Sequence, residues 1–169
     1  MKLTILVAVA ALALGSCGSA VGAEGVAPPS SSLASLPWAG FYQKANEEYG
    51  AGRRDEAVTL FYIGQLRGRV IVQCQRVPPD REPALLASLN ESVGRVMNEY
   101  AGGSPDGWAA SIDRALAFDA AHPDPAAASP ECRLERERQR QGLGQLRDHV
   151  LNNADQIRSE RAARGLPNR

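Results

Sequence analysis

The three cysteines Cys17, Cys74 and Cys132 are the residues of this 169-residue chain with the widest choice of chemistry. Cys17 belongs to a processing signal described below, so Cys74 and Cys132 remain as an even pair. No Cys-x-x-Cys motif, nucleophile elbow or oxyanion-hole signature accompanies them, and a reactive thiol working with His149 is therefore the weaker interpretation. In an exported protein such a pair predicts a disulfide bond, which would contribute about 4 kcal/mol to stability.

Histidines and carboxylates show no spacing that would bring metal ligands or an acid–base pair together. His122 lies in a proline-rich stretch and His149 on the polar side of an expected helix, without a His-x-x-x-His motif. The paired acidic residues suit helix surfaces and first helical turns: Glu47 and Glu48, Asp55 and Glu56, Glu135 and Glu137. We therefore expect no catalytic residue, no metal site and no cofactor.

Residues 1–16 predict a secretory signal peptide, because one lysine precedes an uncharged apolar run that is too short for a comfortable membrane span. Two processing sites compete for its end. The sequence LGSC at residues 14–17 resembles a bacterial lipobox, in which cleavage precedes Cys17 and the thiol carries diacylglycerol. The sequence VGA at residues 21–23 resembles an ordinary cleavage site before Glu24. The lipobox is favoured because Cys17 follows the apolar run immediately.

Residues 17–35 are rich in Gly, Ala, Ser and Pro and almost uncharged, which is typical of a flexible linker. Gly18, rather than Asp, after the cysteine fits the family pattern of lipoproteins sorted to the outer membrane. The resemblance implies an outer-membrane lipoprotein that faces the periplasm and contacts the membrane through its lipid anchor only. Cleavage before Glu24 would instead give a soluble periplasmic or secreted protein.

Residues 36–169 have the length of about one domain, and their apolar residues recur at helical spacing, which predicts an all-α bundle of about five helices. Residues 41–69 organise this bundle as two amphipathic helices with a turn at residues 50–52. Small residues let the helices approach closely. The apolar faces are Trp38, Phe41, Tyr42, Ala45 and Tyr49 on the first, and Ala57, Leu60, Phe61, Gly64, Gly68 and Ile71 on the second.

This pair of helices resembles one tetratricopeptide (TPR) repeat, because Ala45, Gly52, Ala57 and Phe61 fall at the spacing of its small, glycine, alanine and aromatic positions. Tyr49 lies one place later than the usual tyrosine, and no proline closes the motif. An ordinary helical hairpin also fits the pattern. A lone repeat must be covered by other helices of the chain.

In TPR proteins the inner face of the first helix contacts a partner peptide, and by register the resemblance implicates Tyr42, Asn46 and Tyr49. Aromatic anchors flanking an amide suit protein recognition. The alternative is that Tyr42 and Tyr49 pack against the second helix.

Prolines, glycines and caps divide the rest of the body. The β-branched residues 70–72 are interpreted as the end of the second helix, because no partner strand is visible.

After a break at residues 77–80, a third helix is expected over about residues 81–100, and a fourth follows residue 104. A long last helix reaches residue 165, with candidate kinks at Gly142 and Gly144. Serines before or near prolines are expected to cap helices: Ser35, Ser104 and Ser129.

The chain carries 19 basic and 19 acidic residues, so its net charge is zero. This balance does not support binding to nucleic acid or a polybasic attachment to membranes. The charged run at residues 133–141, RLERERQRQ, alternates in sign and predicts a solvated helix face.

These observations favour a non-catalytic, protein-binding module or scaffold of the cell envelope, whose partner is another envelope protein or peptide. A specific version is an inhibitor or immunity protein against a toxin or wall hydrolase. An envelope enzyme or enzyme subunit is the remaining alternative, although no constellation of catalytic residues supports it.

Overall fold

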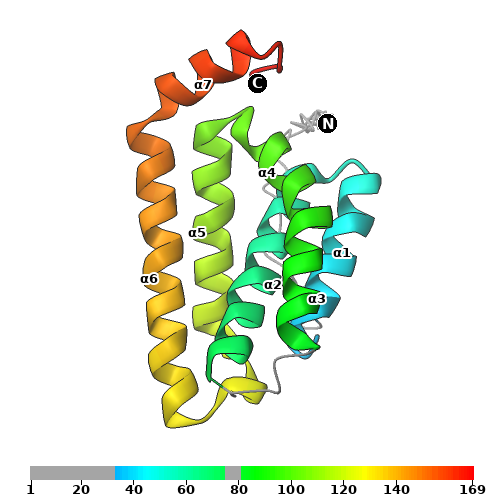
Figure 1. Ribbon diagram of the computed structural model, residues 1–169, viewed down its shortest axis with the longest axis vertical. Coiled ribbons are helices and arrows are strands. Elements are labelled where there is room, and N and C mark those ends of the chain that lie inside the picture. Colours follow the sequence, from blue (N-terminus) through cyan, green and yellow to red (C-terminus); the bar gives the residue numbers. More distant parts are fainter. Residues whose placement is uncertain (1–32, 75–80) are drawn as a thin grey trace, which may run out of the picture.

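The computed structural model describes residues 33–74 and 81–169, and all regular structure in these two ranges is helical, as predicted (Figure 1). The signal peptide, Cys17 and the break at residues 77–80 lie outside the described residues. The elements are α1 (Trp38–Gly50), α2 (Arg54–Cys74), α3 (Glu82–Leu89), the π-helical turn η2 (Asn90–Gly94), α4 (Arg95–Gly102), α5 (Pro105–Ala121), the 3-10 turn η3 (Pro125–Ala127), α6 (Pro130–Asn152) and α7 (Ala154–Ala163).

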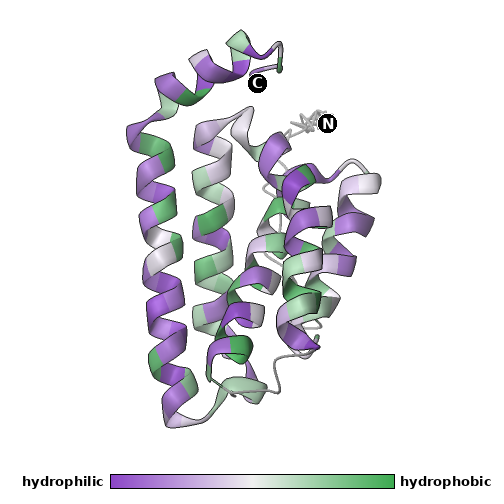
Figure 2. Cartoon of the chain, in the orientation of Figure 1, coloured by the Kyte–Doolittle hydropathy of each residue, from purple (hydrophilic) through white to green (hydrophobic). Residues whose placement is uncertain are grey.

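Helix α2 is the centre of the bundle. It packs against α1, α5 and α6, and against the continuous α3–η2–α4 segment. Residues 70–72 lie within α2, which confirms their interpretation as helix. Because α2 is covered on several sides, most of its residues are buried, whereas the outer helices α6 and α7 are mainly hydrophilic (Figure 2).

The helices α1 and α2 form a hairpin whose close approach depends on glycine. A Cβ atom at Gly64 would lie 2.9 Å from Cβ of Phe41, and one at Gly68 would lie 2.8 Å from the Trp38 ring. Gly52 in the connecting turn has a φ of +85°, which favours glycine. These contacts confirm the predicted close packing of the pair, and the similarity to a TPR repeat stays a prediction.

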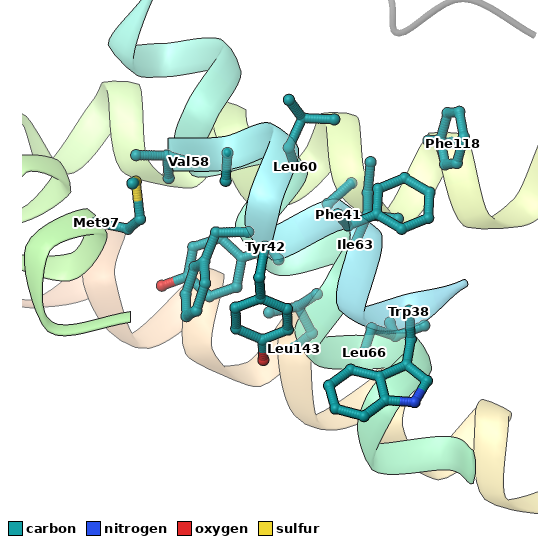
Figure 3. Close-up of a cluster of buried hydrophobic side chains, with 14 of the residues drawn as sticks. Trp38, Phe41, Tyr42, Val58, Leu60, Ile63, Leu66, Met97, Phe118 and Leu143 are labelled. Atoms are coloured by element: carbon teal, nitrogen blue, oxygen red, sulfur yellow. The ribbon is translucent and has the colours of Figure 1, made fainter. Parts of the chain in front are cut away.

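The core lies between α1, α2, α4 and α5, with aromatic rings arranged edge to face (Figure 3). Phe41 and Phe118 have ring centres 5.9 Å apart, and those of Tyr42 and Phe61 are 5.6 Å apart. Such pairs stabilise a core by about 0.5–1.5 kcal/mol beyond the area they bury. The few aromatic residues of the chain are therefore concentrated where they contribute most.

A disulfide bond joins Cys74 to Cys132, as predicted, with the two Cα atoms 4.9 Å apart. It connects the end of α2 to the first turn of α6 across 58 residues. A loop of this length is expected to contribute about 4 kcal/mol through the entropy of the unfolded chain. The bond therefore fixes α6, a largely hydrophilic helix, to the central helix.

The beginning of the folded body differs from the prediction. Leu33 and Ala34, assigned above to the linker, pack against the core, and Leu36 N donates a hydrogen bond to Leu33 O at 3.0 Å. Pro37, not Ser35, is the N-cap of α1, and its side chain makes no capping hydrogen bond. Ser35 lies within the preceding turn, two residues before the N-cap position.

The other predicted serine caps are confirmed. Ser104 Oγ accepts a hydrogen bond from Gly107 N at 3.3 Å, and Ser129 Oγ accepts one from Cys132 N at 3.2 Å. Each serine is followed by a proline in the first turn of its helix.

The last predicted helix is divided in two at a different place from the one expected. Gly142 and Gly144 lie inside α6 with open space beside them, so no close contact at these glycines bends the helix. The division falls at Asn153, whose Nδ2 donates to His149 O at 2.7 Å and so satisfies a carbonyl at the end of α6. Helix α7 then turns across the end of the bundle (Figure 1).

Candidate functional site

Tyr42, predicted to contact a partner, is in fact fully buried, with an exposed fraction of 0%. Its hydroxyl donates to Asn90 Oδ1 at 2.8 Å, and its ring lies among the core side chains (Figure 3). Burial raises its pKa well above the ordinary value, although Arg69 acts in the opposite direction. The ring packs edge to face on Phe61 of α2 and close to Gly64 of the same helix, which agrees with the alternative that Tyr42 packs against the second helix.

The other two predicted contact residues remain accessible. Asn46 is exposed, and Tyr49, at the end of α1, is half-buried. The Tyr49 ring meets the Tyr100 ring of α4 edge to face, with their centres 5.8 Å apart. Tyr49 thus lies at the border between the core and solvent, and it lines a concave feature of the surface.

That feature is a groove of about 280 Å³, which we call the tyrosine–arginine groove. It lies where the ends of α1, α4 and α7 meet the beginning of α2. Its lining residues are Tyr49, Arg54, Val96, Glu99, Tyr100, Arg161, Pro167 and Arg169.

The centre of the groove is formed by two tyrosine rings and two guanidinium groups. The Arg54 guanidinium carbon lies 5.3 Å from the centre of the Tyr49 ring and 5.7 Å from that of Tyr100. The Arg169 guanidinium carbon lies 3.6 Å from the centre of the Tyr100 ring. Two cations therefore share the Tyr100 ring, and each gains cation–π stabilisation from it.

The phenol of Tyr100 is fixed by a hydrogen bond to α2. Its hydroxyl donates to Asp55 Oδ1 at 3.2 Å. Burial is the largest effect on the Tyr100 pKa and raises it, and the nearby Asp55 carboxylate raises it further. At neutral pH the groove therefore presents a neutral phenol between its arginines.

The opposite wall of the groove is made by α7 and the residues after it. Arg161 Nη1 donates to Glu99 O at 2.9 Å, and Arg161 Nη2 donates to Pro167 O at 3.0 Å. Arg169 Nη2 donates to Tyr100 O at 2.8 Å, and its backbone N donates to Gly103 O at 2.6 Å. The chain after α7 is thus held against α4 mainly by hydrogen bonds to backbone carbonyls.

The arginines of the groove are not neutralised by neighbouring carboxylates. Within residues 33–74 and 81–169, no ion pair engages Arg54, Arg161 or Arg169. By contrast Arg158, on the same helix as Arg161, pairs with Asp106 at 3.2 Å and with Asp155 at 3.0 Å. The groove therefore keeps positive charge next to an aromatic surface.

Groups that could do bond-making chemistry are separated in the structure. The His122 ring stacks on Phe118 with the ring centres 4.6 Å apart, and His149 is exposed on α6. The part of the chain that the structure describes contains no group of three or more His, Cys, Asp and Glu residues arranged to hold a metal ion. What the groove offers chemically is stacking, hydrogen-bond donation and positive charge.

Most of the groove was missed by sequence analysis. Tyr100 lies at the end of the predicted third helix and Arg54 just after the predicted turn, and no binding role was expected for either. The one available signal was that Tyr49 and Arg54 flank the hairpin turn, which brings them together. Nothing in the sequence indicated that Arg161 and Arg169 fold back onto α4, because that contact depends on the direction of α7.

Comparison of this chain with protein-family models, with curated proteins and with solved structures gives no match. None of the helices in the described ranges is both long and apolar enough to span a membrane. The site must therefore be interpreted from its own geometry.

Proposed function

We propose that this chain is a non-catalytic protein-binding module of the cell envelope and that its tyrosine–arginine groove holds the partner. The observation that carries the proposal is the exposed surface in which Arg54 lies over both Tyr49 and Tyr100. Tyrosine and arginine are enriched among the residues that dominate binding energy at protein interfaces. The predicted signal peptide and the lipid anchor at Cys17 would place this groove in the envelope.

The groove is suited to binding because its aromatic part is already fixed before a partner arrives. The edge-to-face contact orients Tyr49 against Tyr100, and the hydrogen bond to Asp55 holds the Tyr100 phenol. Fixed side chains lose little conformational entropy on binding, so more of the contact energy is available for affinity.

Site-specific photocrosslinking in cells tests this proposal. Val96 lines the groove and is 37% exposed, whereas Leu85, on α3 and outside the groove, is 43% exposed. A photoreactive phenylalanine analogue at Val96 should crosslink to a discrete envelope protein, and the same analogue at Leu85 should not. Equal crosslinking from both positions, or none from Val96, would rule out the groove as the site.

A binding measurement with the crosslinked protein then completes the test. Tyr49→Ala should weaken its affinity for this chain about tenfold or more, since truncation of an aromatic anchor commonly has an effect of this size. Ala replacement of the exposed Leu85 serves as the matched control and should leave the affinity unchanged. Unchanged affinity in Tyr49→Ala would remove the aromatic pair from the proposal.

A further inference from the structure

We infer that the tyrosine–arginine groove accepts an acidic segment of the partner protein, in which Asp or Glu carboxylates meet Arg54 and Arg169. This inference rests on the proposed function and adds the chemical class of the ligand. It follows from the charge of the groove, from the free hydrogen-bond donors in it and from its shape.

The charge of the groove favours an anionic ligand. Three guanidinium groups line the groove, and one carboxylate side chain, that of Glu99, lines it with them. The carboxylate of Asp55 is nearby, but it accepts its hydrogen bond from the Tyr100 hydroxyl. The side chains around the groove therefore carry an excess of positive charge, although the whole chain is neutral.

Arg54 and Arg169 place their charges near the same aromatic ring. Their guanidinium carbons lie 5.7 Å and 3.6 Å from the centre of the Tyr100 ring. Both cations attract a carboxylate that enters the groove beside this ring. The site is thus electrostatically complementary to an anionic group.

The groove also has hydrogen-bond donors that no other described residue uses. Arg54 is exposed, and no hydrogen bond of its guanidinium to another described residue is found, so its fork of N–H groups is free to bind a carboxylate with two parallel hydrogen bonds. Arg169 is also exposed, and of its guanidinium group only Nη2 donates to a described residue, to Tyr100 O. The Nε of Arg161 lacks a partner but is buried, so Arg54 and Arg169 are the groups that can donate to a ligand.

Shape selects among anionic partners. A concave space of about 280 Å³ between helix ends admits a short stretch of peptide, whereas a broad membrane surface or a duplex would meet only its rim. The apolar side chain of Val96 and the two tyrosine rings add contacts for the backbone and side chains of a peptide. An acidic peptide segment therefore fits both the charge and the form of the site.

The test uses the full mature chain and two synthetic peptides, one of alternating Glu and Gly and the other of alternating Gln and Gly, both with blocked ends. We expect the Glu peptide to bind about tenfold more tightly than the Gln peptide, as measured by fluorescence anisotropy. Its affinity should fall as salt is added. Arg54→Gln and Arg169→Gln should each remove most of this preference, and Arg158→Gln, which is already neutralised in the chain, should not.

Four outcomes would overturn the inference. Equal affinity for both peptides would show that carboxylates are not recognised. Full displacement of the Glu peptide by inorganic phosphate would indicate that the groove binds phosphate groups. Arg54-dependent binding to vesicles, tighter for anionic than for neutral lipid, would indicate a membrane ligand. If the segment of the partner that crosslinks to Val96 contains no Asp or Glu, the acidic ligand is refuted but the proposed function stands. If nothing crosslinks to Val96, the proposed function itself is refuted.

Discussion

The guanidinium carbon of Arg67 lies 4.9 Å from the centre of the Phe41 ring, inside the bundle, where the arginine is only 1% exposed. Its Nη1 donates to Ala34 O at 3.2 Å and its Nη2 donates to His122 O at 2.7 Å. Burial lowers the pKa of Arg67, and the nearby Asp124 and Asp119 act in the opposite direction. One buried cation thus ties the segment before α1 to the end of α5.

Replacement of Arg67 should therefore affect stability strongly. Arg67→Ala removes a large core side chain and leaves two carbonyls without their donors, so we expect the free energy of unfolding to fall by about 3 kcal/mol. Denaturant unfolding measures this change. Arg67→Met should cost less, because it refills part of the volume without a buried charge.

The control for Arg67 is its neighbour Arg69, which is exposed on the same helix. Arg69→Ala should change stability by no more than about 0.5 kcal/mol. If Arg67→Ala lowers the free energy of unfolding as little as Arg69→Ala does, the contacts of the buried guanidinium make no net contribution to stability.

Tyr42 and Tyr49 occupy one face of α1 but should respond differently to truncation. Tyr42 is fully buried, so Tyr42→Ala should lower the free energy of unfolding by about 3–5 kcal/mol. Tyr49 is half-buried at the groove, and Tyr49→Ala should lower it by roughly 1 kcal/mol while weakening partner binding. Similar losses of stability in the two variants would place Tyr49 in the core and remove it from the site.

The same two residues show what could be predicted from the sequence. Helical spacing placed both on the apolar face of α1, and spacing together with prolines, glycines and serine caps predicted most of the helices and the all-α class. Spacing cannot say which part of that face another helix covers. Tyr42 is buried against Phe61 of α2, and its hydroxyl reaches Asn90 of η2, whereas Tyr49 meets only the edge of α4 at Tyr100. Both outcomes depend on tertiary packing. The fold was therefore more accessible to sequence analysis than the site.

Alkaline pH should destabilise the protein through its buried phenols. Burial raises the pKa of Tyr42 and of Tyr62 well above 10.0, although the hydrogen bond from Trp108 lowers that of Tyr62 somewhat. Their folded forms keep the proton that the unfolded chain releases near pH 10. The protonated phenols therefore keep the folded state fully stable below about pH 10. Above pH 10 the free energy of unfolding falls by about 1.4 kcal/mol per pH unit for each phenol, until the pH reaches the folded-state pKa.

Denaturant unfolding at several pH values from about 9 to about 11 measures this slope. Tyr62→Phe loses the hydrogen bonds with Trp108 and Asn98 and should lower stability at neutral pH, but it should also reduce the slope above pH 10 by about half. Tyr42→Phe combined with Tyr62→Phe should remove most of the slope. An unchanged slope in the double variant would mean that other groups cause the alkaline unfolding.

Helix α7 should open more easily than the rest of the bundle. None of its residues is buried, and it is held by polar contacts such as the ion pair between Arg158 and Asp106 and the hydrogen bond from Arg161 to Glu99 O. Helices without buried apolar contacts open locally at a small free-energy cost. We expect the amide hydrogens of α7 to exchange much faster than those of α2, and Arg161→Ala to increase their exchange further without changing α2.

The same exchange measurement connects α7 to ligand binding. Arg161 and Arg169 form one wall of the groove, so a peptide bound between this wall and Arg54 would join α7 to the body of the protein. The Glu–Gly peptide should therefore slow amide exchange in α7, and the effect should be absent in Arg54→Gln. Slower exchange that persists in Arg54→Gln would show that the peptide binds α7 outside the groove, because no contact with Arg54 would then be needed to hold the helix in place.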